Sequence, residues 1–475
     1  MYRKSGVLMH VSSLFGDYSS GSFGKEAKYF IDFLSDSGFS YWQVLPFCMV
    51  DEYNSPYKSY SSFSGNLYFI DLESLHLEGL ITDDELVAAR QNDPYLCEFD
   101  RLRDERFSIL KNASERVLDR SEIEKFIDSS PYLKAFCEFM ARKAANGGVP
   151  WYEWQDYAID EGVLFAWKFI QYTFVRQWLK IKSYANSKGI RIIGDVPIYV
   201  ALDSADVWSA KEQFQLDKNG MPTQVAGVSP DYFSADGQLW GNPLYNWKEM
   251  KKDGYRCWCD RIRYMSTLFD AVRIDHFRAF ASYWSIPAKA ETAAAGKWIK
   301  GPGLPFLKAL KAAAGETEII AEDLGDITPD VCKLVKDSGL PGMKVFQFGF
   351  ISEDNSSHLP HNYPENSVAY SGTHDNNTLL GYLWELDEKT RARMLAYSGH
   401  IGDWKDGLDS MIRTIFASHA GLVMLPIQDI LGYGCDTRLN TPGKAKGNWA
   451  FRITKSQLDS IDRSKWRALN KLYYR

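Results

Sequence analysis

Eight short apolar segments, separated by stretches of helical periodicity, constrain the fold of this chain most strongly. Each segment is rich in branched or aromatic residues and is bounded by Gly, Pro or Asp, which is typical of a buried strand. The stretches between most of them repeat apolar residues at the spacing of an amphipathic helix. The predicted strands are residues 6–10, 42–46, 190–196, 271–275, 318–322, 343–348, 367–371 and 422–425.

The alternation of strand and helix indicates an α/β protein with a parallel sheet. Eight repeats favour closure of that sheet into a (β/α)8 TIM barrel. An open doubly wound sheet is the alternative, but no Gly-rich nucleotide-binding turn follows any of the strands. The predicted helices are residues 25–37, 163–188, 255–268, 305–314, 329–338 and 408–419.

Two intervals are too long to be plain connections. After the second strand, residues 76–160 are charged and helix-prone, so we expect an inserted helical subdomain. After the third strand, residues 198–246 are rich in aromatic residues, Gly and Pro, so we expect a weakly regular aromatic lid. We treat residues 1–475 as one catalytic barrel without a separate C-terminal β-domain.

Composition narrows the class of partner. The 55 basic and 61 acidic residues give a net charge of −6, and no long basic run favours nucleic acid. Seven scattered cysteines without a Cys-x-x-Cys pair support neither a zinc ribbon nor a disulfide scaffold. No apolar stretch is long enough for a membrane span or a signal-peptide core, so we expect a cytoplasmic protein. The oligomeric state stays open.

Acidic residues stand where four of the predicted strands end. In such barrels the active site lies at the C-terminal ends of the strands. Asp195, Asp275, Glu322 and Asp375 therefore surround one mouth. Arg273, two residues before Asp275, faces the same side of its strand and favours the ionised carboxylate.

Two chemistries use such a set of acids. Carboxylates can hold a divalent metal, or a pair of them can act in glycoside chemistry. The aromatic lid favours sugar, because a pyranose ring presents an apolar face to Trp or Tyr. The alternative is a purely structural role, in which the acids form ion pairs of the barrel or cap its helices. We expect no metal and no cofactor.

The chain resembles the 4-α-glucanotransferases (amylomaltases, disproportionating enzymes) of glycoside hydrolase family 77, in the α-amylase clan. The resemblance runs from about residue 5 to about residue 450. Its motifs are Trp-Gln-Val-Leu-Pro at 42–46, Ser-Pro-Tyr at 55–57, Gly-Asp-Val-Pro-Ile-Tyr at 194–199, Pro-Asp-Tyr-Phe at 230–233, Gly-Asn-Pro at 241–243, Arg-Ile-Asp-His-Phe-Arg at 273–278, Ala-Glu-Asp-Leu-Gly at 321–325, Gly-Thr-His-Asp-Asn at 372–376 and Arg-Leu-Asn-Thr-Pro-Gly at 438–443.

The resemblance implies a role for three of the acids. Asp275 would be the nucleophile, and Glu322 the acid/base that protonates the leaving oxygen and later deprotonates the acceptor. Asp375 would bind ring hydroxyls and help to distort the sugar. Such a retaining mechanism needs Glu322 protonated and its carboxyl close to that of Asp275.

The resemblance also implies a set of binding residues, several of which have an ordinary structural reading as well. Tyr57 would stack under the reacting glucose or pack in the core, and Trp240 would be an acceptor platform or a packing residue. The other residues that the resemblance places around the sugar are Arg273, His276, His374, Asp195, Asp231 and Asn440. For Asp231 and Asn440 the alternative is a turn-forming role, and for His10 we expect a buried core histidine.

Four hypotheses on function remain. The first is a transferase with maltodextrin or another α-1,4-glucan as donor and glucose or maltodextrin as acceptor. The second is a retaining α-glucan hydrolase of the same clan, which uses the same three carboxylates. The third is a glucan-binding protein on an inactive barrel, and the fourth is a metal-dependent barrel hydrolase. Donor and acceptor length, and the formation of large cyclic glucans, stay open.

Overall fold

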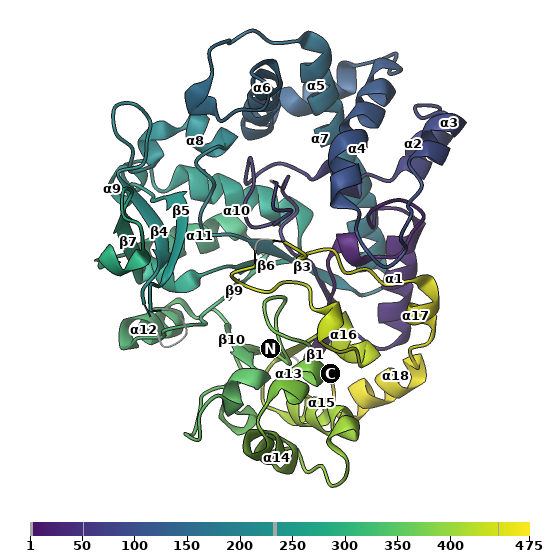
Figure 1. Cartoon of the computed structure of the whole chain (residues 1–475), viewed down its shortest axis with the longest axis vertical. Helices are drawn as coiled ribbons and strands as arrows, with labels where there is room; N and C mark the ends of the chain where they lie inside the picture. Colours follow the sequence, from purple (N-terminus) through teal and green to yellow (C-terminus); the bar gives the residue numbers. More distant parts are fainter. Residues whose placement is uncertain (1–2, 51, 231–234, 445) are drawn as a thin grey trace.

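A closed barrel of eight parallel strands forms the centre of the molecule (Figure 1). The computed structural model describes residues 3–50, 52–230, 235–444 and 446–475. The barrel strands are β1 (Lys4–Leu8), β2 (Tyr41–Gln43), β3 (Arg191–Val196), β6 (Ala271–Ile274), β9 (Glu318–Ala321), β10 (Gly342–Val345), β11 (Ser367–Tyr370) and β12 (Leu422–Pro426). Each strand lies beside the next one along the chain, and β12 closes on β1. The predicted (β/α)8 barrel is confirmed.

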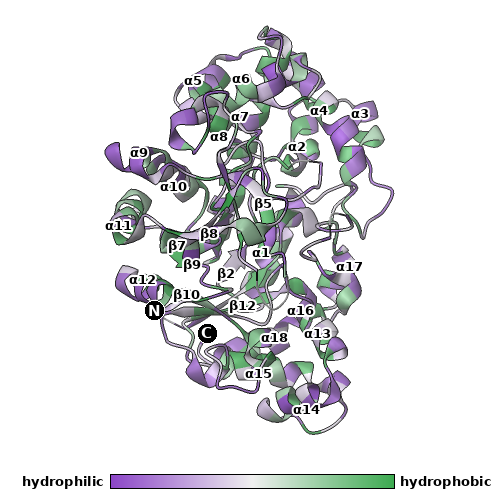
Figure 2. Cartoon of the chain, turned by 60° about the vertical axis from the view of Figure 1, so that its left-hand side comes forward, coloured by the Kyte–Doolittle hydropathy of each residue, from purple (hydrophilic) through white to green (hydrophobic). Residues whose placement is uncertain are grey.

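Helices surround the barrel. They are α1 (Lys25–Asp36), α7 (Glu161–Ser187), α10 (Arg256–Leu268), α11 (Gly303–Ala314), α12 (Pro329–Ser338), α13 (Leu379–Glu385), α14 (Glu388–Tyr397), α15 (Leu408–Ala417), α16 (Ile427–Leu431), α17 (Lys455–Asp459) and α18 (Arg463–Leu472). In Figure 2 the outlying turns of α9 (Trp247–Lys252) and α12 are largely hydrophilic. None of the helices in the described part of the chain has the length and apolar character needed to cross a membrane.

Side chains of the barrel strands alternate between two buried layers. Val272 and Ile274 on β6 pack with the apolar residues of the surrounding helices. Ala271 on the same strand and Ile320 on β9 belong to a separate apolar cluster inside the barrel. Glu322 comes two residues after Ile320 and therefore lies on the same inner side. Because β9 ends at Ala321, its side chain is directed toward the mouth of the barrel.

The sixth barrel strand is shorter than predicted. β10 ends at Val345, and Phe346–Phe350 forms a 3-10 helix instead of continuing the strand. The rings of Phe346 and Phe350 contact each other with centroids 5.1 Å apart. A helical turn brings residues four apart onto one side, whereas a strand would carry them well apart along its axis. The 3-10 helix that brings the two rings together therefore takes the place of the last part of the predicted strand.

Helices fill the insertion that follows β2, as predicted. They are α2 (Leu72–Leu77), α3 (Asp83–Ala88), α4 (Phe99–Glu115), α5 (Ser121–Asp128) and α6 (Pro131–Ala145), followed by the 3-10 turn Trp151–Glu153. Of these, α4, α5 and α6 pack against α7, whose Trp167 contacts Phe107 of α4 and Phe136 of α6 at ring-centroid distances of 5.0 and 5.6 Å. The insertion is thus attached to the barrel through α7 (top of Figure 1).

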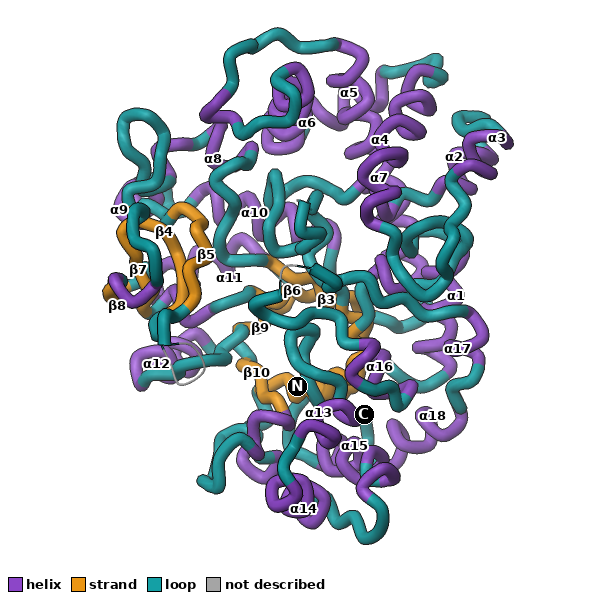
Figure 3. The backbone as a smooth tube through the Cα atoms, viewed as in Figure 1, coloured by secondary structure: helices purple, strands orange, loops and turns teal. Residues whose placement is uncertain are grey.

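The segment after β3 is more regular than the predicted loop. It contains α8 (Ala205–Ser209) and two strands, β4 (Gln224–Val228) and β5 (Gln238–Pro243). These strands join β7 (Ser282–Pro287) and β8 (Lys297–Lys300) in an antiparallel sheet of order β5-β4-β7-β8, which lies to the side of the barrel in Figure 3. Besides the neighbouring β5, β4 pairs with β7, which comes after the fourth barrel strand. No local pattern around β4 reveals a partner so distant in sequence.

Gly194 allows β3 to approach the start of β6 closely. A Cβ atom at this position would lie 2.3 Å from Cδ2 of Phe269, whose ring is buried. Gly194 directly precedes Asp195, so the same close packing also sets the position of that carboxylate.

We predict that Gly194→Ala lowers the free energy of unfolding by about 1–3 kcal/mol, because the added methyl group overpacks the core against Phe269. Urea denaturation measures the change. Gly434→Ala is the control, since its Cβ would meet only the flexible carboxylate of Asp436, at 3.2 Å. Equal stability of the two variants would contradict the packing argument.

Candidate active site

Arg273 joins two carboxylates at the mouth of the barrel. Its strand β6 pairs with β3 so that Arg273 lies opposite Asp195. Nη1 of Arg273 forms a close ion pair with Oδ2 of Asp195, and Nη2 lies 2.8 Å from Oδ1 of Asp275. Burial alone would lower the pKa of the guanidinium, but the facing Asp195 and Asp275 raise it well above its usual value. The arginine is therefore a fixed positive charge between the two acids.

Asp275 directly follows the end of β6. Burial raises its pKa to about 6, against the opposing effect of Arg273, and the negative Asp195 and Asp375 add to the rise. Its side chain keeps 29% of its surface exposed. At neutral pH the carboxylate is thus ionised, oriented by Arg273 and still accessible from the mouth of the barrel.

Glu322 stands at the corresponding place on the neighbouring strand. Ile274 and Ala321, the residues before Asp275 and Glu322, are paired across β6 and β9. The backbone N–H groups of His276 and Leu324 donate to the two carboxyl oxygens of Glu322, at 2.6 and 2.9 Å. Burial raises the pKa of Glu322 well above its usual range, although Arg273 and these hydrogen bonds oppose the rise. The surroundings of Glu322 therefore favour its protonated form.

The backbone of His276 connects Asp275, which precedes it in the chain, with Glu322, which accepts a hydrogen bond from its N–H group. Its φ of 48° lies in the left-handed region, which is uncommon for a residue with a side chain. In this conformation its N–H group donates to Glu322, while its ring contacts Trp240 edge-on with centroids 4.9 Å apart. Burial, together with Arg278, lowers the pKa of His276 to about 3, so the ring is neutral.

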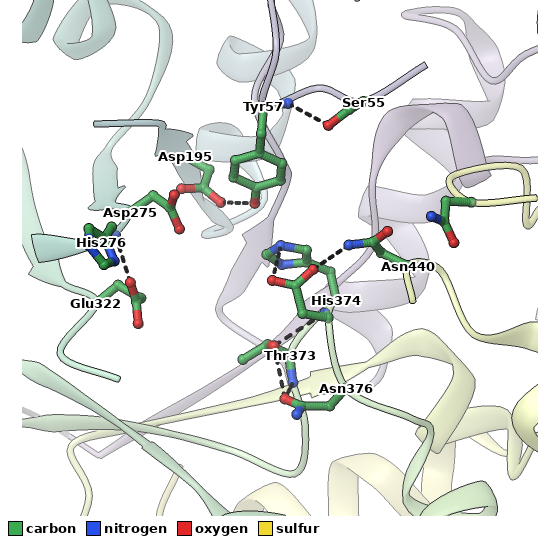
Figure 4. A network of polar contacts seen from close by, with 12 residues as sticks. Ser55, Tyr57, Asp195, Asp275, His276, Glu322, Thr373, His374, Asn376 and Asn440 are labelled. Atoms are coloured by element: carbon green, nitrogen blue, oxygen red, sulfur yellow. Dashed lines mark hydrogen bonds and ion pairs between the residues drawn. The ribbon is translucent and has the colours of Figure 1, made fainter. Parts of the chain in front are cut away.

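Asp375 follows β11 and contacts His374 and Asn440, which lie across the site from Glu322 in Figure 4. Its Oδ2 lies 3.3 Å from Nε2 of His374, and its Oδ1 accepts a hydrogen bond of 2.6 Å from Nδ2 of Asn440. Burial alone would raise the pKa of Asp375, but His374 and Asn440 bring it well below its usual value. Asp375 is therefore ionised, in contrast to Glu322.

Tyr57, from the segment after β2, bridges the two sides of the site. Its hydroxyl donates to Oδ2 of Asp195 at 2.6 Å, and its ring stacks on His374 with centroids 5.1 Å apart and planes 13° apart. Burial and the nearby Asp195 raise its pKa well above the usual value, so the hydroxyl remains a donor. Because His374 covers one face of the ring, a sugar could stack only on the opposite face.

Of the remaining residues named from the sequence, Trp240 lies at the edge of the site and His10 is buried. Trp240 on β5 keeps 37% of its surface exposed and lies over His276, at the edge of the site. His10 is buried, and its Nδ1 accepts a hydrogen bond of 3.2 Å from the backbone N–H of Leu45. Asp231 lies outside the described residues. The structure thus brings together every predicted site residue that it describes.

Two residues at the site had no role in the sequence analysis. Nη2 of Arg438 donates to the backbone carbonyl of Asp375 at 2.5 Å, and its Nε donates to that of Asn440 at 2.7 Å. The ring of Trp449 lies 5.9 Å from those of both Tyr57 and His374. Arg438 could have been inferred from its place two residues before Asn440. For Trp449 the only indication in the sequence is that it follows Gly447 and Asn448 and does not lie within an apolar run.

The carboxylates of the site are held by an arginine, an amide and backbone N–H groups. Among the described residues, no group of three or more His, Cys, Asp or Glu side chains is arranged to hold a metal ion. The site therefore combines an acid whose surroundings favour the protonated form, two ionised acids and a fixed cation, a set that suits proton transfer and nucleophilic attack at one bond.

Comparison with known proteins assigns the chain to a family. A family model described as 4-alpha-glucanotransferase, glycoside hydrolase family 77, matches residues 9–458. The chain belongs to glycoside hydrolase family 77. The family resemblance drawn from its sequence motifs is confirmed, and with it the prediction of a transglycosylating enzyme.

Individual members of family 77 align over nearly the whole chain. The 4-alpha-glucanotransferase of Streptococcus pneumoniae is 44% identical over 476 residues, which cover 96% of this chain and 94% of the relative. That of Thermus thermophilus is 39% identical over 501 residues, with 98% of each chain covered. The solved amylomaltase of Streptococcus agalactiae, in complex with acarbose, superposes with a TM-score of 0.95 at 37% identity and covers 100% of this chain and 99% of its own.

We predict that Arg273→Met lowers the free energy of unfolding by about 3–5 kcal/mol at neutral pH, because it leaves the buried Asp195 and the partly exposed Asp275 without a counter-ion. The difference in unfolding free energy from the wild type becomes smaller at acidic pH, where a proton neutralises Asp275. Thermal and urea denaturation at both pH values measure it.

The control for this prediction is Arg256→Met. The side chain of Arg256 is 78% exposed and lies 3.7 Å from Asp260, so its loss costs little. A loss of stability in Arg273→Met no larger than in this control would show that the buried ion pairs do not stabilise the site.

Proposed function

We propose that this enzyme transfers α-1,4-glucan segments from a donor maltodextrin to glucose or another maltodextrin by a retaining double displacement. The observation that supports this most strongly is the pair of Asp275 and Glu322. These carboxyls stand at the ends of adjacent strands, where Arg273 pairs with Asp275 and burial raises the pKa of Glu322 well above its usual range. Neighbouring strands lie about 4.8 Å apart, which is compatible with the ~5–5.5 Å between the reacting carboxyls of a retaining glycosidase.

In the first step, Oδ of Asp275 attacks the anomeric carbon of the donor. The bond between that carbon and the glycosidic oxygen breaks, and the proton of Glu322 passes to the leaving oxygen. The glucosyl unit is then an ester of Asp275. The raised pKa of Glu322 supports its role as the acid, and the ion pair of Asp275 with Arg273 supports its role as the nucleophile.

In the second step, the 4-hydroxyl of the acceptor gives its proton to Glu322 and its oxygen attacks the anomeric carbon. The ester bond to Asp275 breaks, and the donor's configuration is restored by the second inversion. The two backbone N–H groups that hold Glu322 keep its carboxyl in the same place for both proton transfers.

The surrounding residues have binding and positioning roles in this proposal. Asp375 accepts hydrogen bonds from ring hydroxyls and stabilises the positive charge of the oxocarbenium-like transition state, because it is ionised and rigidly held by Asn440. Asp195 orients Arg273 and Tyr57, and Trp240 supports the acceptor. Asp231 keeps the sugar-binding role that the family resemblance implies.

A hydrolase of the same clan is the second candidate, because water can replace the acceptor hydroxyl. The transferase is favoured by the names of the related proteins and by the lid, since Trp240 supplies an aromatic surface beside His276 where a sugar can displace water. The proposal includes a cytoplasmic location and no cofactor. Neither an inactive glucan-binding barrel nor a metal-dependent hydrolase has a specific observation in its favour.

We predict that Asp275→Asn lowers the rate of maltotriose disproportionation about 10³-fold or more, because the amide cannot act as the nucleophile. Chromatography of the products measures both glucose and the ladder of longer maltodextrins. Asp436→Asn, at an exposed acid, is the control. Full turnover of Asp275→Asn would contradict the assignment, and reducing ends without longer products in the wild type would favour the hydrolase.

We predict a bell-shaped dependence of kcat/KM on pH. Activity falls as the pH drops through about 6, because Asp275 becomes protonated there. Activity also falls on the alkaline side, as Glu322 loses its proton at its raised pKa. Residual activity of Glu322→Gln should lack the alkaline fall. A wild-type rate that stays constant well below pH 6 would contradict the role of Asp275.

A further inference from the structure

Residues 371–378 connect β11 to α13 and carry two groups of the site, His374 and Asp375. They form bends and turns rather than a helix or a strand. The backbone hydrogen bonds of a regular element therefore do not set the positions of these two side chains. The positions depend instead on contacts between this segment, here called the β11 loop, and other parts of the chain.

One carboxylate holds both ends of the β11 loop. Asp429 lies on α16, which follows the last barrel strand, and only 2% of its surface is exposed. Its Oδ2 accepts a hydrogen bond of 2.5 Å from the hydroxyl of Ser371, at the start of the loop. Its Oδ1 accepts one of 2.7 Å from the backbone N–H of Leu379, where α13 begins. The two ends of the loop are thus fixed to each other through a single side chain.

The two hydrogen bonds account for the burial of this carboxylate. Burial raises the pKa of Asp429 to about 6, while Ser371 and Leu379 oppose the rise. Within the described residues those two donors act on the carboxylate, and no cation adds to them. A buried polar group is tolerated where hydrogen bonds satisfy it. An apolar side chain would fill the same space but would leave the N–H of Leu379 without its acceptor.

Other contacts hold the middle of the β11 loop at single points. Nε2 of Gln347, in the 3-10 helix after β10, donates to the backbone carbonyl of Asn377 at 2.8 Å. Arg438 donates to the carbonyl of Asp375. Asp429 differs from both because it joins the start of the loop to its end. A change at Asp429 would therefore release both ends at once.

We infer that Asp429 is a positioning residue for the reaction, which acts through the β11 loop on Asp375 and His374. Because it is buried, it does so without contact with a sugar. The inference rests on the proposed function, in which the carboxylate of Asp375 stabilises the transition state. A displacement of about 1 Å in such a group can cost about a hundredfold in rate. Since Asp429 acts through Asp375, the effects of changing the two residues should not be additive.

A double-mutant cycle tests this coupling. The donor is maltotriosyl fluoride, whose fluoride leaves readily so that slow variants can be followed, and the acceptor is maltose. Leucine has the shape of aspartate but accepts no hydrogen bond. Asp429→Leu should lower kcat/KM for the donor about tenfold or more by itself, but less than about twofold in the Asp375→Asn background. Asp429→Asn keeps one acceptor oxygen for Leu379, so its effect should be smaller, and it replaces Asp429→Leu if that variant does not fold.

Asp71→Asn is the matched control. Asp71 is also buried, and it too accepts hydrogen bonds from a serine hydroxyl and a backbone N–H, both of Ser74, but at the start of α2 in the insertion. Urea denaturation should show a loss of stability in both Asp71→Asn and Asp429→Asn, while kcat/KM should fall only in the latter.

An equal fall in kcat/KM with and without Asp375 would overturn the positioning role, because a general structural defect acts in both backgrounds. Unchanged kcat/KM in the Asp429 variants would overturn it as well. Failure of the proposed function would be seen separately, as a wild type that forms no maltodextrin longer than the donor.

Discussion

The ion pairs of Arg273 are the interaction on which the rest of the site depends. The guanidinium is almost fully buried between Asp195 and Asp275. The hydroxyl of Tyr57, from the segment after β2, also donates to Asp195. A buried charge is tolerated only where opposite charges and hydrogen bonds satisfy it. The arginine therefore requires that the ends of β3 and β6 stay in register, and this requirement links the order of the barrel to the geometry of the carboxyls.

Around this fixed charge, the pKa values of three carboxyls of similar chemistry shift in different directions. Glu322 is buried and held by backbone N–H groups, Asp275 is paired with the arginine, and Asp375 is held by His374 and Asn440. Burial raises the first two pKa values, and His374 and Asn440 bring the third below its usual range. The division between acid and nucleophile thus arises from the surroundings of each group rather than from its identity.

The parts outside the barrel add aromatic side chains beside its mouth. The sheet β5-β4-β7-β8 brings Trp240 over His276, and the turn after α6 places Tyr152 in the wall of a cavity that Trp240 also lines. These elements come from segments that follow three different barrel strands, β2, β3 and β6. The surroundings of the mouth are therefore built from parts of the chain that lie far apart in the sequence.

Local patterns in the sequence were sufficient to predict the eight barrel strands and the direction of Arg273, because the alternation of side chains along a strand and the spacing of helical faces are properties of neighbouring residues. The family motifs added the residues of the site. The sheet beside the barrel, the shortened β10 and the roles of Arg438 and Trp449 were not predicted. The sheet and the two roles depend on contacts between groups far apart in the sequence, such as Val225 with Ile286 or Trp449 with Tyr57, whereas β10 is cut short by a helical turn over Phe346–Phe350. The pKa values too belong to the tertiary structure alone, since burial and the nearest charges exist only once the chain has folded.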